Sequence, residues 1–163
     1  MAVDIFLKLD GIKGESLDDK HKDEIVLESF SWGLSNTAAH NIASGQAGGK
    51  ASFQDIHFTS KVSVASTKLM LHCATGEHIK TGTITFRKAD PSKENLGFEF
   101  LFYKFENILI TSVQEAGDTS DRPLDSVSFA FGKINVEYKP QTPAGGVGTA
   151  VNFAWNLAAN AKV

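Results

Sequence analysis

Apolar and polar positions alternate over the first residues of the chain. Every odd position from residue 3 to residue 9 carries valine, isoleucine or leucine, and this period of two is typical of a β-strand that buries one face. Phe6 lies among the polar positions, so we expect the second face of this strand to be covered as well. Residues 10–24 bring glycines and mixed charges without a period, which predicts a solvated loop.

Residues 25–35 show a second strand pattern, and its two faces differ. Large apolar side chains occupy one parity, whereas small residues occupy the other. We therefore predict one long strand with a heavy apolar face and a small polar face. The apolar face consists of Val26, Phe30, Trp32 and Leu34, and the small face consists of Ser29, Ser31 and Gly33.

Residues 36–50 are small and polar and have neither a strand nor a helix period. Structureless loops of this length are uncommon in compact domains and are usually functional or mobile, so we predict an extended loop here. The pair Gly49 and Lys50 is similar to the end of a phosphate-binding loop. That motif requires glycine where Ser44 stands and serine or threonine where Ala51 stands, and we reject it.

Residues 63–76 hold the one convincing helical pattern, with the helix itself over about 64–75. Ser63 or Ser66 can cap its amino end, and Gly76 suits the left-handed residue that follows the last turn. The remaining patterns are strands separated by turn residues. They comprise a strand marked by Phe53, Ile56 and Phe58, and residues 79–88, 96–105, 107–115, 126–138 and 151–157. Many strands and one short helix predict a mainly β fold, an antiparallel barrel or sandwich.

Composition narrows the classes of protein that fit this pattern. The 163 residues suit a single domain over 1–163, and 42% hydrophobic residues with twelve phenylalanines exclude a disordered tail. A net charge of −3 without a basic cluster excludes nucleic acid as a partner. The single cysteine, Cys73, cannot form an intrachain disulfide. We find no secretory signal pattern and no apolar stretch of membrane-spanning length, and therefore expect a cytosolic protein without membrane insertion.

Two groups of residues could carry chemistry, and neither forms a recognised constellation. His72, Cys73 and His78 lack the converging spacing of a zinc site, and we interpret Cys73 as a small core residue. Asp55 and His57 share one strand face, yet no serine or cysteine motif accompanies them. We therefore assign no catalytic residue, no cofactor and no metal.

The aromatic residues of segment 96–105 point to assembly. Phe98, Phe100 and Phe102 occupy one parity, and Tyr103 and Phe105 lie in the other. A strand that is apolar on both faces must be covered twice, either within its own domain or by another subunit. This pattern favours a protein that assembles with other copies.

Several segments, in the order in which they occur, resemble the Hcp (haemolysin-coregulated protein) family of bacterial type VI secretion. The resemblance spans nearly the whole chain. It is carried by AVDIFLKL at 2–9, KGES at 13–16, SWG at 31–33, the glycine-containing segment before Gln54 and Asp55, the helix from Leu69 and Met70 to Gly76, TFRK at 85–88 and FAWN at 153–156.

The resemblance implies a two-sheet antiparallel β-barrel with one flanking α-helix, a fold shared with phage tail-tube proteins. It further implies that six copies close into a ring and that rings stack into a hollow tube, which contraction of a sheath expels. Effectors travel or are chaperoned in the lumen. The implied partners are other copies of this chain, the spike protein, the contractile sheath, the baseplate and secreted effectors. The protein would be cytoplasmic before firing and extracellular afterwards, without a cleaved signal peptide.

The same resemblance suggests roles for two sets of residues. Ser29, Ser31 and Gly33 would line the lumen and contact effectors. The loop over about 36–50 would reach a neighbouring subunit or ring, through His40, Ser44, Gly45, Gln46, Gly48, Gly49 and Lys50.

Two other readings of the sequence remain open. The chain could form a free ring that acts mainly as an effector-binding chaperone, with little tube building. It could also be a β-barrel enzyme that uses Asp55, His57 or Cys73. Stacked rings separate the first alternative from a tube subunit, and alanine substitutions at the three residues test the second.

Overall fold

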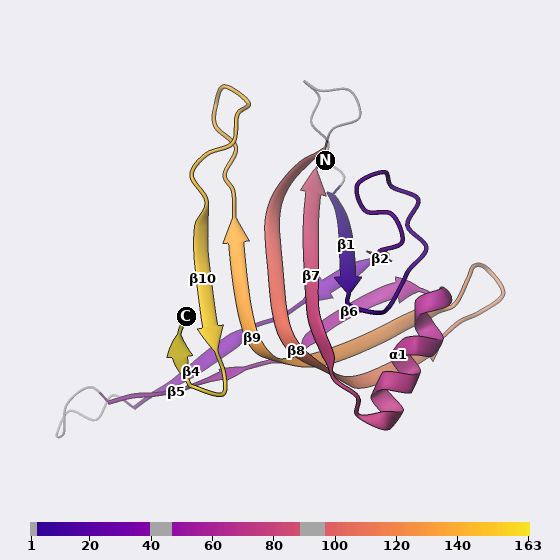
Figure 1. Cartoon of the computed structure of the whole chain (residues 1–163), viewed down its shortest axis with the longest axis horizontal. Helices are drawn as coiled ribbons and strands as arrows, with labels where there is room; N and C mark the ends of the chain where they lie inside the picture. Colours follow the sequence, from indigo (N-terminus) through magenta and orange to yellow (C-terminus); the bar gives the residue numbers. More distant parts are fainter. Residues whose placement is uncertain (1–2, 40–46, 89–96) are drawn as a thin grey trace.

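The structure, a computed structural model, describes residues 3–39, 47–88 and 97–163. Strands dominate these residues, and a single helix lies at one end of the molecule (Figure 1). The elements are β1 (Val3–Leu9), β2 (Ile25–Leu27), β3 (Ser29–Ser31), β4 (Leu34–Ala39), β5 (Ala47–Phe53), β6 (Ile56–Lys61), α1 (Val64–Thr75), β7 (Ile79–Lys88), β8 (Phe98–Ala116), β9 (Leu124–Tyr138), β10 (Val151–Asn156) and β11 (Ala161–Lys162).

All strand pairs are antiparallel, as predicted, and the two longest strands connect the parts of the sheet. The main hydrogen-bonded order is β11-β10-β9-β8-β7-β1-β2. β9 pairs with β10 through residues 133–138 and with β6 through residues 124–129, and β6 in turn pairs with β3. β9 therefore belongs to two regions of the sheet. It curves across the molecule together with its neighbour β8 (Figure 1).

The sheet does not close into the predicted barrel within the described residues. β2 pairs with β1, whereas β3 pairs with β6. Glu28 separates the two short strands, and its backbone N–H donates to the Thr59 carbonyl at 2.7 Å. The β1–β2 edge and the β3–β6 edge are therefore joined by the backbone at Glu28 and not by hydrogen bonds between neighbouring strands. A bent strand makes the same kind of corner between packed sheets.

This bend also corrects the prediction of one long strand over 25–35. Ile25 and Leu27 are buried and Val26 is 46% exposed, so Val26 does not share the apolar face of Phe30. The parity of the buried positions changes at Glu28 because the chain leaves one partner strand there and joins another. A period count along the sequence cannot detect such a change of partner.

The hydrophobic core lies between the curved sheet and α1. Phe58, Phe105, Phe129 and several aliphatic side chains are fully buried, and Phe105 and Phe129 meet edge to face at 5.2 Å. On β1, the odd positions Leu7 and Leu9 are buried as the alternation predicted. Phe6 on the opposite face is also buried, which confirms that β1 is covered on both sides.

Helix α1 forms where its capping residues predicted it. The Ser63 side chain accepts from the Ala65 N–H at 3.2 Å, and the Ser66 hydroxyl accepts from the Ser63 N–H at 3.0 Å, a reciprocal arrangement that satisfies free donors of the first turn. Gly76 ends the helix in the left-handed conformation with φ 71°. Leu69 faces the core.

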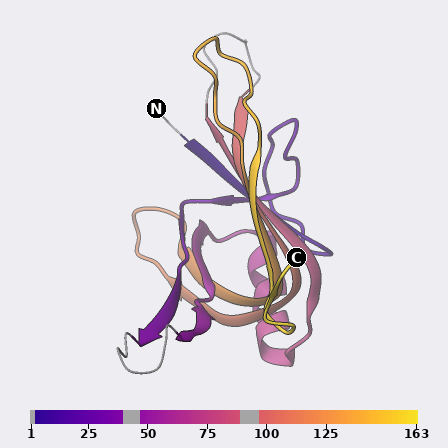
Figure 2. The same cartoon turned by 90° about the vertical axis from the view of Figure 1, so that its left-hand side faces the viewer.

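The segment 36–50 is in part a β-hairpin and not the structureless loop that we predicted. β4 and β5 pair from Leu34 and Phe53 outward to Ala39 and Ala47, and this hairpin projects away from the body of the protein (Figure 2). Gly49 allows the two strands to approach, because a Cβ atom there would collide with the Thr37 carbonyl oxygen. The predicted loop residues His40, Ser44, Gly45 and Gln46 lie outside the described residues.

Two other boundaries differ from the prediction. The predicted strands 96–105 and 107–115 are, in the part that the structure describes, one continuous strand, β8. Asn107, between the two predicted strands, adopts a left-handed conformation with φ 56° within this continuous strand. The segment 10–24 is not simply solvated, because Ile12, Ser16 and His21 are buried.

Charged groups attach this segment to the sheet. Arg87 on β7 donates to both oxygens of Asp18, at 3.0 and 2.5 Å, and this pairing holds the pKa of Asp18 at about 2, below its ordinary 3.8. The His21 ring stacks on Phe6 at 4.3 Å. Its two nitrogens lie 2.8 Å from the Glu24 carboxylate and 2.7 Å from that of Glu99 on β8. Residues 10–24 are therefore an ordered part of the fold.

Candidate functional site

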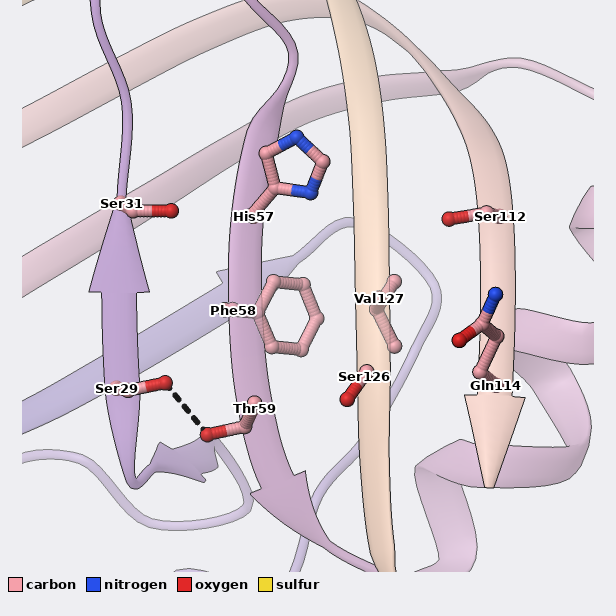
Figure 3. A pocket seen from close by; sticks show the side chains of 9 residues that line it. All are labelled: Ser29, Ser31, His57, Phe58, Thr59, Ser112, Gln114, Ser126 and Val127. Carbon is pink, nitrogen blue, oxygen red and sulfur yellow. Dashed lines mark hydrogen bonds between the residues drawn. The ribbon is translucent and has the colours of Figure 1, made fainter. Parts of the chain in front are cut away.

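A shallow concavity lies on the outer face of four neighbouring strands, β3, β6, β9 and β8. Its volume is about 380 Å³. Figure 3 shows the side chains that line it: Ser29, Ser31, His57, Phe58, Thr59, Ser112, Gln114, Ser126 and Val127. Hydroxyl, amide and imidazole groups dominate this lining, which contains no Lys, Arg, Asp or Glu side chain.

Strand register explains why these side chains meet. Two rows cross all four strands: Ser29, Thr59, Ser126 and Gln114 form one, and Ser31, His57, Ser128 and Ser112 form the other. We refer to these eight residues as the polar face. The intervening row, Phe30, Phe58, Val127 and Val113, belongs to or packs against the core. Side chains in a strand alternate between faces, so a core row between two polar rows is what the pleat requires.

The prediction identified only the edge of this face. Ser29 and Ser31 lie on β3 and line the concavity, whereas Gly33 lies beyond the end of β3 and is not among the lining residues. The Gly33 carbonyl instead accepts from the Gln54 N–H at 3.0 Å. His57 and Thr59 alternate with buried Ile56 and Phe58, and this local signal could have indicated a second polar strand. Nothing in the sequence indicated which strands become neighbours.

Hydrogen bonds fix several hydroxyl groups on and beside the polar face. Ser29 Oγ and Thr59 Oγ1 lie 2.6 Å apart, as drawn in Figure 3. Thr111 Oγ1 donates to Asp55 Oδ2 at 2.7 Å and lies 2.8 Å from Ser128 Oγ. Ser128 Oγ lies 2.6 Å from Ser112 Oγ. A continuous chain of hydroxyls therefore connects the concavity to the Asp55 carboxylate.

A β-bulge builds that chain. Ile110 pairs with Phe129 and Ser112 pairs with Ser128, so Thr111 is an extra residue in β8. A bulge places two residues of one strand opposite one residue of the other and redirects their side chains. As a result, the successive hydroxyls of Thr111 and Ser112 both reach the buried hydroxyl of Ser128.

Aromatic side chains hold the base of the projecting hairpin. The Trp32 indole N–H donates to the Gln54 carbonyl at 3.0 Å, and its ring packs near Phe53 at 6.3 Å. Phe53 in turn packs on Trp155 of β10 at 6.2 Å. These contacts hold the base of the hairpin against the body of the protein, while Lys50 farther along β5 is exposed.

An apolar surface extends from the core along the other end of the sheet. One row runs from buried Ile84 through Tyr103 and Val136 to Phe153, which is 38% exposed. A second row passes through Phe86 and Leu101 and ends at Tyr138 and Val151, which are 45% and 59% exposed. We call these two rows the apolar stripe. Large apolar patches at the surface commonly mark interaction sites.

The residues considered for catalysis lie in two places: Asp55 and His57 lie at or beside the polar face, and His72, Cys73 and His78 lie on or just after α1. Asp55 accepts the Thr111 hydroxyl, and His57 lies on the polar face. Cys73 is half-buried and packs against the core, His72 Nδ1 is buried without a hydrogen-bond partner, and His78 Nδ1 lies 2.7 Å from Asn107 Oδ1. Among the described residues, no three His, Cys, Asp or Glu side chains are grouped as metal ligands. No helix in the described part of the chain has the length and apolar character needed to cross a membrane.

Comparisons with known proteins show to which family the chain belongs. Residues 6–138 match the family model T6SS_HCP, described as "Type VI secretion system effector, Hcp". Protein hcp1 of Pseudomonas aeruginosa is 33% identical over 99% of both chains. The solved structure of a type six secretion system protein is similar with a TM-score of 0.90 and 33% identity, covering 99% of this chain and 100% of that one. Hcp1 of Salmonella typhimurium is similar with a TM-score of 0.81 and 32% identity over the whole of both chains. The chain therefore belongs to the Hcp family and is a type VI secretion tube protein.

Proposed function

We propose that six copies of this chain close into a ring whose channel is lined by the polar face, and that stacked rings form the inner tube which carries effectors. The two polar rows across β3, β6, β9 and β8 are the observation that carries this proposal. Most of their side chains are small hydroxyl groups, all can form hydrogen bonds, and the lining of the concavity holds no Lys, Arg, Asp or Glu side chain. Such a wall binds varied proteins weakly and does not obstruct their passage.

The apolar stripe supports assembly between copies. Phe153, Tyr138 and Val151 continue the face of the sheet that elsewhere forms the core, so a second copy would bury a surface that is already shaped as half of a core. A closed ring uses two different patches of each subunit. We place one of them on the apolar stripe.

The projecting hairpin supports contacts beyond the ring neighbour. β4 and β5 pair only with each other within the described residues, and isolated two-stranded hairpins are marginally stable. Contact of the hairpin, including Gly48, Gly49 and Lys50, with an adjacent subunit or ring would stabilise it. The spike, the sheath, the baseplate and secreted effectors complete the partners that this role requires, and secretion would follow sheath contraction from the cytoplasm.

Ring formation is tested first. We expect negative-stain images of the purified chain to contain six-fold rings with open centres, and Phe153→Asp to yield single subunits because a carboxylate would be buried in the interface. Leu71→Asp is the matched control, since Leu71 is an exposed apolar residue on α1. Intact rings of Phe153→Asp would remove the apolar stripe from the proposed interface.

Cargo binding is tested separately. Ser31→Leu places a bulky side chain on the polar face, and we expect it to reduce co-purification of effectors while rings persist. Ser120→Leu, in the exposed turn between β8 and β9, is the control. Unchanged effector retention by Ser31→Leu would argue against a lumenal role of the polar face. Rings that bind effectors but never stack would instead favour a free chaperone ring.

A further inference from the structure

A count of hydroxyl hydrogens decides which group donates and which accepts in each hydrogen bond of the chain that joins Ser112 to Asp55. Thr111 gives its single hydroxyl hydrogen to Asp55 Oδ2, so toward Ser128 it can only accept. Ser128 must therefore donate to Thr111, and Ser112 must donate to Ser128. A serine or threonine hydroxyl has one hydrogen and two lone pairs, and this limit leaves no alternative order for a chain that ends with Asp55 Oδ2 as the acceptor.

This order leaves Ser112 with lone pairs and without a free hydrogen. Ser112 lines the concavity, while Ser128 beneath it is only 4% exposed. Each hydroxyl in a hydrogen-bonded chain polarises the next, and the chain ends on a negative charge at Asp55. The Ser112 oxygen is therefore held as an acceptor, and its accepting strength is raised.

We propose that the Ser112 side of the concavity selects groups that donate hydrogen bonds and carry positive charge, the ammonium or guanidinium groups of lysine and arginine side chains of a cargo protein. The lining also holds neutral donors, such as the Gln114 amide. At Ser112, however, a carboxylate would find no donor, and it would approach the Asp55 charge through the hydroxyl chain. No lysine or arginine lies in the lining to offset this bias. The natural ligand rests on the proposed function, whereas the chemical preference rests on this chain alone.

Thr111 acts as a positioning residue in this scheme. It is not among the residues that line the concavity, yet it alone links Ser128 to Asp55 in the hydrogen-bonded chain. Thr111→Val keeps the shape and net charge but removes the link. Thr111→Ser retains the hydroxyl, so it separates the loss of the link from the loss of packing.

The test uses the full chain with butylammonium chloride and sodium butyrate as probes, two ions of equal length and opposite charge. Ligand-observed saturation-transfer NMR measures the dissociation constant of each, and we expect butylammonium to bind more tightly than butyrate. Thr111→Val should raise the butylammonium dissociation constant about threefold to tenfold, the value of one ordinary hydrogen bond. Thr111→Ser should restore binding. Ser120→Ala, which removes an exposed hydroxyl in the turn between β8 and β9, away from the concavity, should leave it unchanged.

Three results would overturn the proposal: tighter or equal binding of butyrate, no change in Thr111→Val, or equal weakening by Thr111→Ser and Thr111→Val. Circular dichroism checks the fold of each variant. If Thr111→Val does not fold, Ser112→Ala removes the acceptor itself, and unchanged binding in that variant also overturns the proposal. Electron microscopy of the same samples keeps the two ideas apart: a butylammonium preference without rings supports this site and counts against the tube, while rings without the preference refute this site alone.

Discussion

The ion pair between Asp18 and Arg87 should make stability depend on pH in a defined window. Both Asp18 oxygens accept from the guanidinium, and the pair attaches the segment 10–24 to β7. The pKa of Asp18 is lowered from 3.8 to about 2, chiefly by its hydrogen bonds to Arg87. Because the folded state prefers the ionised carboxyl, the pair contributes stability above pH 3.8 and loses it as the pH falls toward 2.

The size of this contribution follows from the pKa. Lowering it from 3.8 to about 2 corresponds to roughly 2 kcal/mol at full strength. The Asp18 side chain retains 25% of its surface, and solvent screens charges at such positions. We therefore expect Asp18→Asn to lower the free energy of unfolding at pH 7 by about 1 kcal/mol.

Urea unfolding at a fixed protein concentration, followed by circular dichroism between pH 7 and pH 3, measures this difference. The gap between wild type and Asp18→Asn should be largest at pH 7 and narrow below about pH 4. Asp19→Asn is the control, because it makes the same charge change at the exposed neighbouring residue. A gap that is constant with pH, or an equal loss in Asp19→Asn, would refute the reasoning.

Three further changes test other parts of the fold. Ser63→Ala removes the side-chain acceptor at the start of α1, and it should lower the free energy of unfolding by about 1 kcal/mol in urea titrations. Gly82→Ala places a Cβ atom 2.7 Å from the Ile108 Cδ1 atom, and thermal unfolding should show a loss of about 1–3 kcal/mol. Loss of solvation and contact with Asp125 raise the pKa of Glu115 above its ordinary 4.5, so its contribution to stability is complete below that pH and is lost as the pH rises. Glu115→Gln should remove this part of the pH dependence of stability, measured as the urea midpoint at several pH values.

Each of these changes has a variant that isolates its cause. Ser63→Asp retains an acceptor and should keep the stability of α1. Equal losses of unfolding free energy in Ser63→Asp and Ser63→Ala would show that the side-chain cap does not stabilise the helix. Ile108→Val removes the Cδ1 methyl, and combining it with Gly82→Ala should cost less than the sum of the single changes. Additive losses would contradict the collision. For Glu115, a pH dependence identical to that of wild type in Glu115→Gln would assign the titration to another group.

Local patterns predicted the elements whose signals lie within a few neighbouring residues. The alternation over residues 3–9 became β1, and the capping serines with Gly76 bounded α1 as expected. Both signals act over one strand pleat or one helical turn, and the whole interaction is therefore present in the local sequence. For the same reason, the small polar residues Ser29 and Ser31 were found at the surface.

Tertiary structure decided the features that depend on which strands become neighbours. The bend at Glu28 exchanges β1 for β6 as the partner strand, and no period within 25–35 encodes that exchange. Residues 36–50 lack an apolar alternation, yet β4 and β5 pair there because backbone hydrogen bonds need no particular side chain.

The polar face illustrates the same division. The sequence by itself determined that Ser29 and Ser31 share a small face and that His57 and Thr59 alternate with core residues. Only the pairing of β3, β6, β9 and β8 placed them in two rows, and only the bulge at Thr111 connected Ser112 to Asp55. Alternation is a property of one strand, whereas register and bulges belong to pairs of strands distant in sequence, and the fold of the entire chain sets them.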